Sequence, residues 1–397
     1  MQIGERIAAY RKRRGMSQDA LAGLVGMSRS WLSQVERGIH TVDRLSTLTD
    51  LAAVLRVDAA DLVGREWRLA PNGGSHVQAI DAISRQLADY SHLLGEQRQP
   101  WPLPQLRNAA VEIHRAYQAA HYDRAAAALP KVLAAADAYD GYTGRAGREI
   151  YLARCMVYAV TAKLLTKVGE SHMAWLAADR ATHAAMAADS LTAQGVAAYQ
   201  AVCALLEDEQ VDQAERVAIS SAERLTGHAA SDAPDTVSLA GALWLIAGVI
   251  AARKADRSAA IGRLNTAEQL TGLIGHDANH AWTAFGPTNV RIHRASCFAE
   301  LGDPYAVLGV ATEIDVNALP DGLNGRRSRM HLDLAWAQTQ ARNDMEAILH
   351  LQQAEQVAPE VLRYDRIARG LVRELLRRAR RPRPALSMMA TRAGILS

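Results

Sequence analysis

The chain has 397 residues, of which 45 are Lys or Arg and 42 are Asp or Glu, with a formal net charge of +3. This length allows two or three domains with a large buried core, and a charge this close to zero gives by itself no electrostatic reason to bind nucleic acid. Aromatic residues make up only 5% of the chain, strand-like runs of β-branched residues are scarce, and alanine is abundant. We therefore expect an all-α fold of closely packed helices.

The cysteines and the apolar segments indicate the cellular compartment in which we expect the protein. Cys155, Cys203 and Cys297 lie far apart and show no metal-ligand spacing, so we expect a reducing cytoplasm and no bound metal. The first residues include no apolar stretch of signal-peptide length. Residues 236–252 are uncharged but too few for a convincing membrane span. We predict that they form the most buried helix of the core and that the chain has no membrane partner.

Residues 17–38, SQDALAGLVGMSRSWLSQVERG, contain two short helical patterns separated by a break at Gly26. This arrangement is typical of a helix-turn-helix, which needs a sharp bend between its two helices. Ser17 and Ser28 stand where N-caps would begin these helices. The second helix presents a face able to hydrogen-bond in a DNA groove, opposite the inward residues Leu21, Ala22, Val25, Leu32 and Val35.

The flanking residues complete a small domain. A first helix is expected over residues 3–14, and the basic run from Arg11 to Arg14 at its end supplies local positive charge for DNA, although cations also suit the dipole of a helix C-terminus. Leu45, Leu48, Leu51 and Leu55 predict a supporting helix, and residues 58–63 a short last one. Residues 1–66 should thus form a five-helix domain. Residues 67–104, with the turn sequence PNGG at 71–74, should form a linker and a connecting helix.

Residues 3–64 resemble the helix-turn-helix domain of the phage-repressor-like, XRE-type transcription factors, through MSQ at 16–18, ERG at 36–38 and the apolar positions between them. The resemblance implies that the second helix enters the major groove with Arg29, Ser30, Trp31 and Gln34 facing bases, and that Gln18 clamps a phosphate. The bulky Trp31 departs from the family pattern. The alternative is that this face is only solvated. The full set of predicted DNA-binding residues is Arg14, Gln18, Ser28, Arg29, Ser30, Trp31, Ser33, Gln34 and Arg37.

From residue 105 the chain becomes repetitive. Alanines that open an apolar helix after a polar turn recur at intervals of 49, 40, 46, 46 and 41 residues, at Ala125, Ala174, Ala214, Ala260, Ala306 and Ala347. Such regularity indicates a helical solenoid, and each segment that an alanine opens resembles the second helix of a tetratricopeptide repeat. Because these intervals exceed the ~34 residues of the standard repeat, we expect longer helices and an irregular superhelix over residues 105–380.

The concave surface of a solenoid usually binds extended ligands. We predict a helix over residues 280–300 on that surface, with Phe285, Asn289 and His293 on one face and Asn289 able to hold a peptide amide. The alternative is that Pro287 kinks the helix and Asn289 satisfies a freed carbonyl. The second inner helix is expected over residues 148–167, and there Tyr151, Arg154 and Tyr158 form a polar and aromatic stripe for which core packing is an equal alternative. The predicted ligand-binding residues are Tyr151, Arg154, Tyr158, Trp244, Trp282, Phe285, Asn289 and His293.

The C-terminal segment is rich in arginine, with nine between Arg363 and Arg383. This run could bind nucleic acid or an acidic partner, but we favour the solvated end of a terminal capping helix, followed by a poorly ordered tail over residues 381–397. The chain shows no Ser-His-Asp order, no phosphate-cradling glycine loop and no paired catalytic carboxylates, so we expect neither enzymatic activity nor a cofactor.

The combined architecture resembles the peptide-responsive quorum-sensing regulators of Gram-positive bacteria and regulators of actinomycetes. The resemblance implies a cytoplasmic, ligand-controlled transcriptional regulator whose signal is a peptide or small molecule. Since one domain of this kind reads a half-site, we expect a homodimer on a palindromic operator in double-stranded DNA. The alternative is a DNA-tethered scaffold whose solenoid recruits a protein partner without a small ligand.

Overall fold

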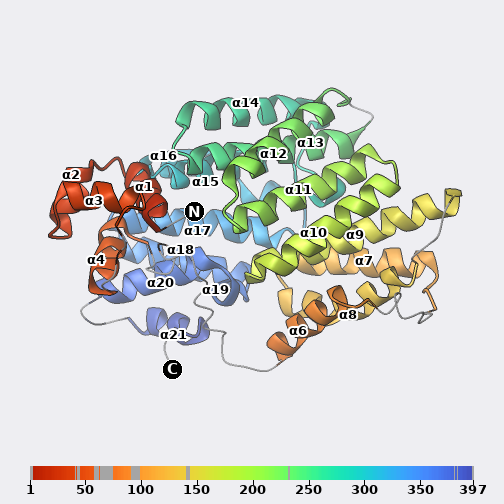
Figure 1. Cartoon of the computed structure of the whole chain (residues 1–397), viewed down its shortest axis with the longest axis horizontal. Helices are drawn as coiled ribbons and strands as arrows, with labels where there is room; N and C mark the ends of the chain where they lie inside the picture. The colour runs from red at the N-terminus through yellow and green to blue at the C-terminus, as the bar shows by residue number, and fades with distance from the viewer. Residues whose placement is uncertain are drawn as a thin grey trace.

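The computed structural model of the chain (Figure 1) describes residues 3–40, 42, 45–57, 62, 75–90, 99–139, 144–230, 233–379, 381 and 383–395. Every regular element within these ranges is a helix, so the all-α prediction is confirmed. The predicted short helix over 58–63 and the PNGG turn lie outside the described residues, apart from Leu62, which is helical and buried.

The N-terminal domain contains α1 (Ile3–Arg13), α2 (Gln18–Leu24), α3 (Arg29–Glu36) and α4 (Leu45–Leu55). The predicted N-caps are confirmed, because the Ser17 and Ser28 hydroxyls accept the amide protons of Ala20 and Trp31, each at 3.1 Å. Gly26 has a positive φ of 69° at the bend between α2 and α3, a conformation that favours glycine. The domain has its own core of Ile7, Leu21, Ala22, Leu32, Val35, Leu48, Leu51, Ala52, Leu55 and Leu62.

After α6 (Ser75–Leu87), consecutive helices pack as antiparallel pairs, which form the solenoid. The predicted repeat alanines lie near the start of the second helix of each pair and are fully buried, except for the partly exposed Ala306. The pairs are α7 (Leu103–Gln118) with α8 (Tyr122–Asp137), α9 (Gly144–Val168) with α10 (Ser171–Ala187), α11 (Leu191–Glu207) with α12 (Val211–Thr226), α13 (Pro234–Arg253) with α14 (Arg257–Ile274), α15 (Pro287–Glu300) with α16 (Pro304–Ala311), and α17 (Asn324–Gln340) with α18 (Asp344–Val357).

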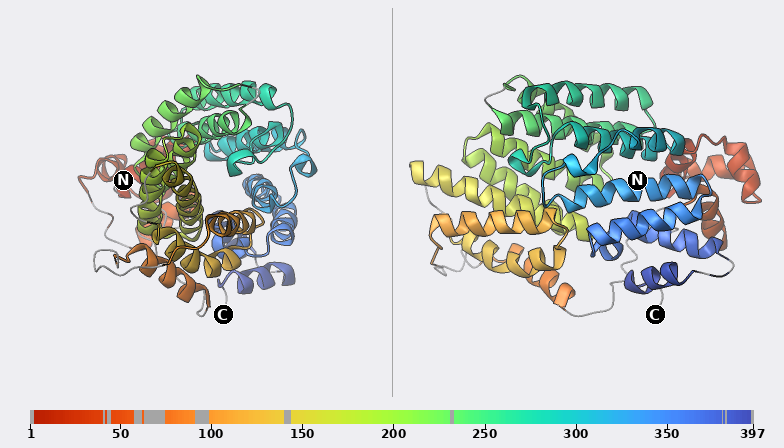
Figure 2. Two further views of the ribbon diagram at one scale, coloured as in Figure 1. Left: turned by 90° about the vertical axis from the view of Figure 1, so that its right-hand side faces the viewer. Right: turned by 180° about the vertical axis from the view of Figure 1, so that it is seen from behind.

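The solenoid closes on itself, as the end-on view in Figure 2 shows. The Glu360 carboxylate, at the start of the short helix α19 (Val361–Tyr364), accepts the backbone amides of Tyr122 and Asp123 at 2.8 and 3.1 Å and so caps α8. Arg363 forms an ion pair with Asp123 at 2.6 Å. The first and last parts of the repeat region therefore share one core, and the array is a ring of helices rather than an open arc.

Helix α13 is the central apolar helix. It is long and apolar enough to cross a membrane, but 83% of its most apolar window is buried inside the structure. Gly241 allows this packing, since an added Cβ would lie 2.1 Å from the Phe285 ring. The segment predicted to be the most buried helix thus occupies the middle of the second solenoid core.

The C-terminal tail differs from the prediction. Residues after Pro382 were expected to be poorly ordered, but Pro384–Arg392 forms α21, whose Leu386 and Met389 are buried against α20 (Arg366–Arg378) and the neighbouring core. Leu386, Met389 and Ala390 have the spacing of one helix face, but the arginine- and proline-rich residues just before them favoured disorder in the sequence-based prediction. The segment therefore belongs to the folded solenoid.

Candidate functional site

Helix α3 presents its polar side chains outward because its apolar ones are fixed in the domain core. Leu32 and Val35 are completely buried, which leaves Arg29, Ser30 and Arg37 exposed and Ser33 and Gln34 partly exposed. In Figures 1 and 2, α2 and α3 lie on the side of the N-terminal domain that faces away from the solenoid. The predicted reading face is thus open to a large ligand.

The exposed face is only loosely engaged by the protein itself. Arg29 lies 3.6 Å from the Asp19 carboxylate, and both side chains are about two-thirds exposed. A surface pair of this kind contributes little, typically below ~1 kcal/mol, so Arg29 can exchange it for a base or phosphate. Trp31 differs from its neighbours, because its ring packs partly against the domain core. Only part of that ring is available outside.

Gln18 begins α2 and is tied to the end of α3. Its Nε2 donates to Glu36 Oε2 at 2.8 Å, and Arg11 donates to both oxygens of the same carboxylate at 2.6 and 2.9 Å. Burial alone would raise the pKa of Glu36, but the hydrogen bonds from Arg11 and Gln18 hold it below its ordinary value. This three-residue cluster fixes the angle between α1, α2 and α3, and it orients the Gln18 amide at the edge of the reading face.

The structure places Arg14 away from the reading face. Its guanidinium donates to the Val54 carbonyl at 2.5 Å, and burial followed by the nearby charge of Arg56 lowers its pKa to about 10. The preceding Arg11 and Arg13 are also engaged inside the molecule, whereas Lys12 is exposed. Most of the basic run therefore holds structure together, because α1 ends between the domain core and the solenoid.

Three arginines dock the N-terminal domain on the C-terminal ends of the inner solenoid helices. Arg6 binds the Glu209 carboxylate just beyond α11, and Arg56 donates to the Gln340 side chain at the end of α17. Arg13 donates to the Arg253 carbonyl at 3.0 Å and lies 3.5 Å from Glu300, at the ends of α13 and α15. Cations favour helix C-termini because of the helix dipole. This docking surface was not predicted from the sequence.

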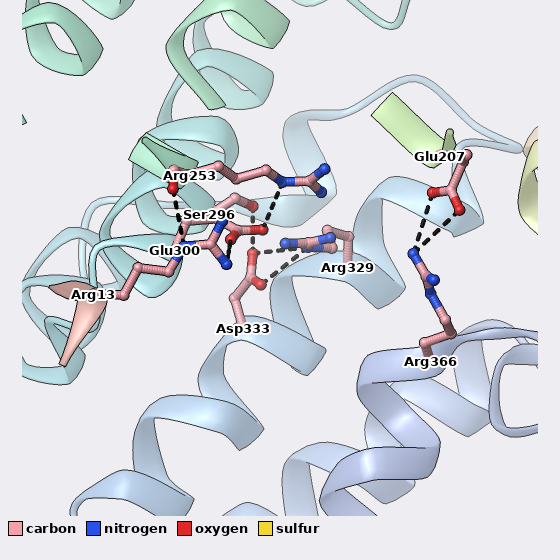
Figure 3. A network of polar contacts seen from close by, with 8 residues as sticks. All are labelled: Arg13, Glu207, Arg253, Ser296, Glu300, Arg329, Asp333 and Arg366. Carbon is pink, nitrogen blue, oxygen red and sulfur yellow. Dashed lines mark hydrogen bonds and ion pairs between the residues drawn. The ribbon is translucent and has the colours of Figure 1, made fainter. Parts of the chain in front are cut away.

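The docking contact continues into a polar network inside the solenoid (Figure 3). Arg253 lies 3.3 Å from Glu300 of α15. On the same helix, Ser296 donates to Asp333 of α17, which also accepts Arg329 at 3.0 Å. Other polar contacts cross the ring: Lys167 of α9 pairs with Asp365, and Arg366 of α20 with Glu207 of α11. We give the name inner surface to the polar residues of these contacts together with Gln118 and Lys163, which bond the Trp282 carbonyl, and Arg326, whose charge acts on Lys163: Gln118, Lys163, Lys167, Glu207, Ser296, Glu300, Arg326, Arg329, Asp333, Asp365 and Arg366.

The predicted stripe of Tyr151, Arg154 and Tyr158 does not lie on the inner surface. Arg154 lies nine residues before Lys163. At 3.6 residues per turn this is about two and a half turns, so the two side chains leave α9 on opposite sides. The Tyr158 hydroxyl donates to Asp137 of α8, and Arg154 lies over the rings of Tyr151 and Tyr158 at 5.7 and 5.8 Å. These residues join α9 to its neighbours, as the packing alternative had it.

Trp244 and Phe285 are also packing residues. The indole of Trp244 donates to the Thr226 hydroxyl of α12 at 3.0 Å, and Phe285 is fully buried against α13. Phe285 does not share a helical face with Asn289, because α15 begins only at Pro287. Proline at the first helical position starts the helix instead of kinking it. Left-handed backbone at Ala281, Trp282 and Ala284 breaks the chain before it.

Trp282, Asn289 and His293 remain near the interior. Trp282 stacks on His114 of α7 with the ring centroids 4.8 Å apart, and its carbonyl accepts Lys163 Nζ at 3.1 Å. His293 is buried and bonds the Asn289 carbonyl at 2.8 Å. Burial, followed by the charge of Arg326, lowers the pKa of His293 to about 3. The Asn289 side chain is 1% exposed, and both of its polar atoms lack a hydrogen-bond partner.

Comparison with known proteins identifies the first domain. Residues 2–63 match the family model described as a helix-turn-helix domain. The chain is 42% identical over 88 residues to the HTH-type transcriptional regulator SlrR of Bacillus subtilis (strain 168), an alignment that covers 20% of this chain and 58% of SlrR. It is 39% identical over 71 residues to SinR of the same organism, covering 18% of this chain and 64% of SinR.

A third relative is the immunity repressor protein of Bacillus phage phi105, with 39% identity over 66 residues, or 17% of this chain and 45% of that protein. The chain thus spans between 45% and 64% of the length of these curated relatives. The residues that match the family model lie in the N-terminal domain, and the predicted helix-turn-helix is confirmed.

Proposed function

We propose that this protein is a sequence-specific DNA-binding transcriptional regulator that reads DNA with α3. The observation that carries the proposal is the exposed polar face of α3 on a helix-turn-helix domain similar to those of named regulators and a phage repressor. Arg29 is suited to guanine and Gln34 to adenine, and each well-formed pair contributes about 1–3 kcal/mol of discrimination. No enzymatic role is proposed, since these relatives are transcriptional regulators.

The test is a double substitution on the reading face. Arg29→Ala with Gln34→Ala should weaken binding to the cognate operator by about 2–6 kcal/mol, or at least roughly 30-fold, and leave weak nonspecific binding. Fluorescence anisotropy on operator and scrambled duplexes measures both. Arg216→Gln, which removes an exposed charge from α12 on the solenoid, is the matched control. Unchanged operator affinity in the double variant would disprove the assignment.

A dimer is part of the proposal, because one such domain reads a half-site and paired half-sites lie about 34–36 Å apart. We infer that the solenoid supplies the dimer contact and sets the spacing of the two reading heads. Light scattering of the protein free and with a palindromic operator tests it. A monomer under both conditions would contradict the dimer.

We also propose that a ligand on the inner surface controls DNA binding, with the protein acting in the cytoplasm. The buried, unpartnered amide of Asn289 supports a ligand in the interior, and the contacts of Glu300 with Arg253 and with Arg13 support a coupling of the solenoid to the reading domain. Asn289→Ala should weaken the response to ligand and leave operator binding by the free protein nearly unchanged. A stoichiometric protein partner, with no small ligand altering DNA affinity, would instead favour the scaffold alternative.

A further inference from the structure

Two cations on the inner surface lack the carboxylate partners that neighbouring cations have. Lys167, Arg329 and Arg366 each pair with an acid. Lys163 instead donates to the Trp282 carbonyl at 3.1 Å, and the charge of Arg326 acts on the Tyr199 hydroxyl. Within the described ranges, neither Lys163 nor Arg326 forms an ion pair with an acidic side chain. Cations enclosed by protein are costly unless they are paired.

Arg326 lies where many helices converge. It stands in the first turn of α17, and its charge acts on groups from α7, α8, α9, α11 and α15: Tyr117, Tyr122, Lys163, Tyr199, Cys203 and His293. Burial, together with this charge, lowers the pKa of Lys163 to about 8. Contacts of Gln118 place the two cations in one cluster: Lys163 and Gln118 donate to the same Trp282 carbonyl, at 3.1 and 3.3 Å, and a Cβ added at Gly325, next to Arg326, would lie 3.6 Å from the Gln118 carbonyl oxygen. Both nevertheless keep partial contact with solvent.

We propose that Lys163 and Arg326 form the recognition site for a carboxylate on the ligand, whether that ligand is a small carboxylic acid or the C-terminus of a short peptide. The proposal rests on the ligand-controlled function above and specifies its ligand class. Two cations without an acidic partner, near the Tyr199 hydroxyl and the partly exposed Trp282, suit a group with a single negative charge and an apolar body. The acids Glu207, Asp333 and Asp365 remain on the same surface and disfavour a dianion such as phosphate.

Cys203 is a built-in reporter for this site. It lies within electrostatic reach of both Lys163 and Arg326 and is partly exposed, whereas Cys155 and Cys297 are 2% and 1% exposed. Burial raises the pKa of its thiol to about 12, so alkylation is slow at neutral pH for any reagent. Iodoacetate and iodoacetamide have nearly the same size and differ in charge. The rate with iodoacetate divided by the rate with iodoacetamide therefore measures how strongly the surroundings of Cys203 favour an anion. The fraction of Cys203 present as thiolate does not affect this ratio, because both reagents react with the same thiolate.

The experiment measures this ratio by peptide mass spectrometry at neutral pH, where both cations are protonated. We expect the ratio in the native full-length protein to exceed that of the unfolded chain by roughly threefold or more. Lys163→Met and Arg326→Gln should each lower it toward the unfolded value, and Arg216→Gln should not. A native ratio equal to the unfolded one, or unchanged in both variants, overturns the proposal. Failure would leave the operator binding of α3 untouched, which separates the two hypotheses.

A second arm distinguishes the sources of the carboxylate. Sodium benzoate and a short peptide with a free C-terminus are each tested for slowing the reaction of iodoacetamide with Cys203. Protection by benzoate assigns the site to small carboxylic acids, and protection by the peptide, but not by its amidated form, assigns it to peptide C-termini. If neither slows the reaction, the carboxylate assignment is wrong.

Discussion

The N-terminal domain places its functional side chains on one short exposed helix, whereas the solenoid collects its polar groups from helices far apart in the chain. The reading face lies on the eight residues of α3. The inner surface, by contrast, depends on pairs such as Lys167 with Asp365, which are 198 residues apart. A local motif can therefore specify the first surface, and only closure of the ring creates the second.

The two regions also differ in how they treat charge. Exposed Arg29 is held by a weak surface pair and can leave it. Interior cations such as Arg329 are tied to a buried acid, so a change there must move its partners as well. This contrast suits the proposed function, in which the reading face is always accessible and the solenoid would respond to a ligand by rearranging its polar contacts.

The largest effect is expected from a substitution that destabilises the N-terminal domain and leaves the solenoid core intact. An added Cβ at Gly4 of α1 would lie 1.8 Å from the Val35 carbonyl oxygen of α3, so Gly4→Ala should destabilise the N-terminal domain by about 3 kcal/mol. Gly23→Ala on α2 is the control, because its Cβ meets nothing within 4 Å and alanine favours helices. Urea unfolding, followed by hydrogen exchange in α1 and α3, measures both. Equal stability of the two variants would refute the close α1–α3 contact.

A smaller effect tests the buried interior of the solenoid. His293 has a folded pKa of about 3, below its ordinary value of 6.5, so the unfolded chain binds the proton first and stability falls as pH drops below 6.5. Between about pH 6 and pH 4 the wild type should lose up to about 1.4 kcal/mol per pH unit more than His293→Gln. His114, whose pKa is also lowered by burial, is common to both proteins and cancels. Parallel stability curves would show that His293 is solvated.

The smallest effect concerns the junction between the regions. Arg13 and Glu300 are each 18% exposed and 3.5 Å apart, so a double-mutant cycle with Arg13→Gln and Glu300→Gln should give a coupling of about 0.5–1 kcal/mol. The readout is the free energy of unfolding in urea, with hydrogen exchange in α1 to localise the change. Arg29→Gln paired with Glu300→Gln is the control and should show no coupling. If the effects of the two single substitutions are additive, Arg13 and Glu300 are not coupled, and this ion pair does not connect the solenoid to the N-terminal domain.

The sequence determined the helical class, the N-caps at Ser17 and Ser28, the outward face of α3 and the repeat alanines. Each of these depends on spacing within one or two neighbouring helices, and helical periodicity is a local property. Prediction from the sequence failed where the position of a side chain depends on which side of a helix faces the interior, or on contacts between residues far apart in the chain. Arg14 faces Val54, the Tyr151 stripe faces away from the interior, and Phe285 precedes α15. Only the tertiary structure brought Lys163 and Arg326 into one cluster around Gln118 and brought Arg13 to Glu300, because ring closure and domain docking join residues that no local pattern connects.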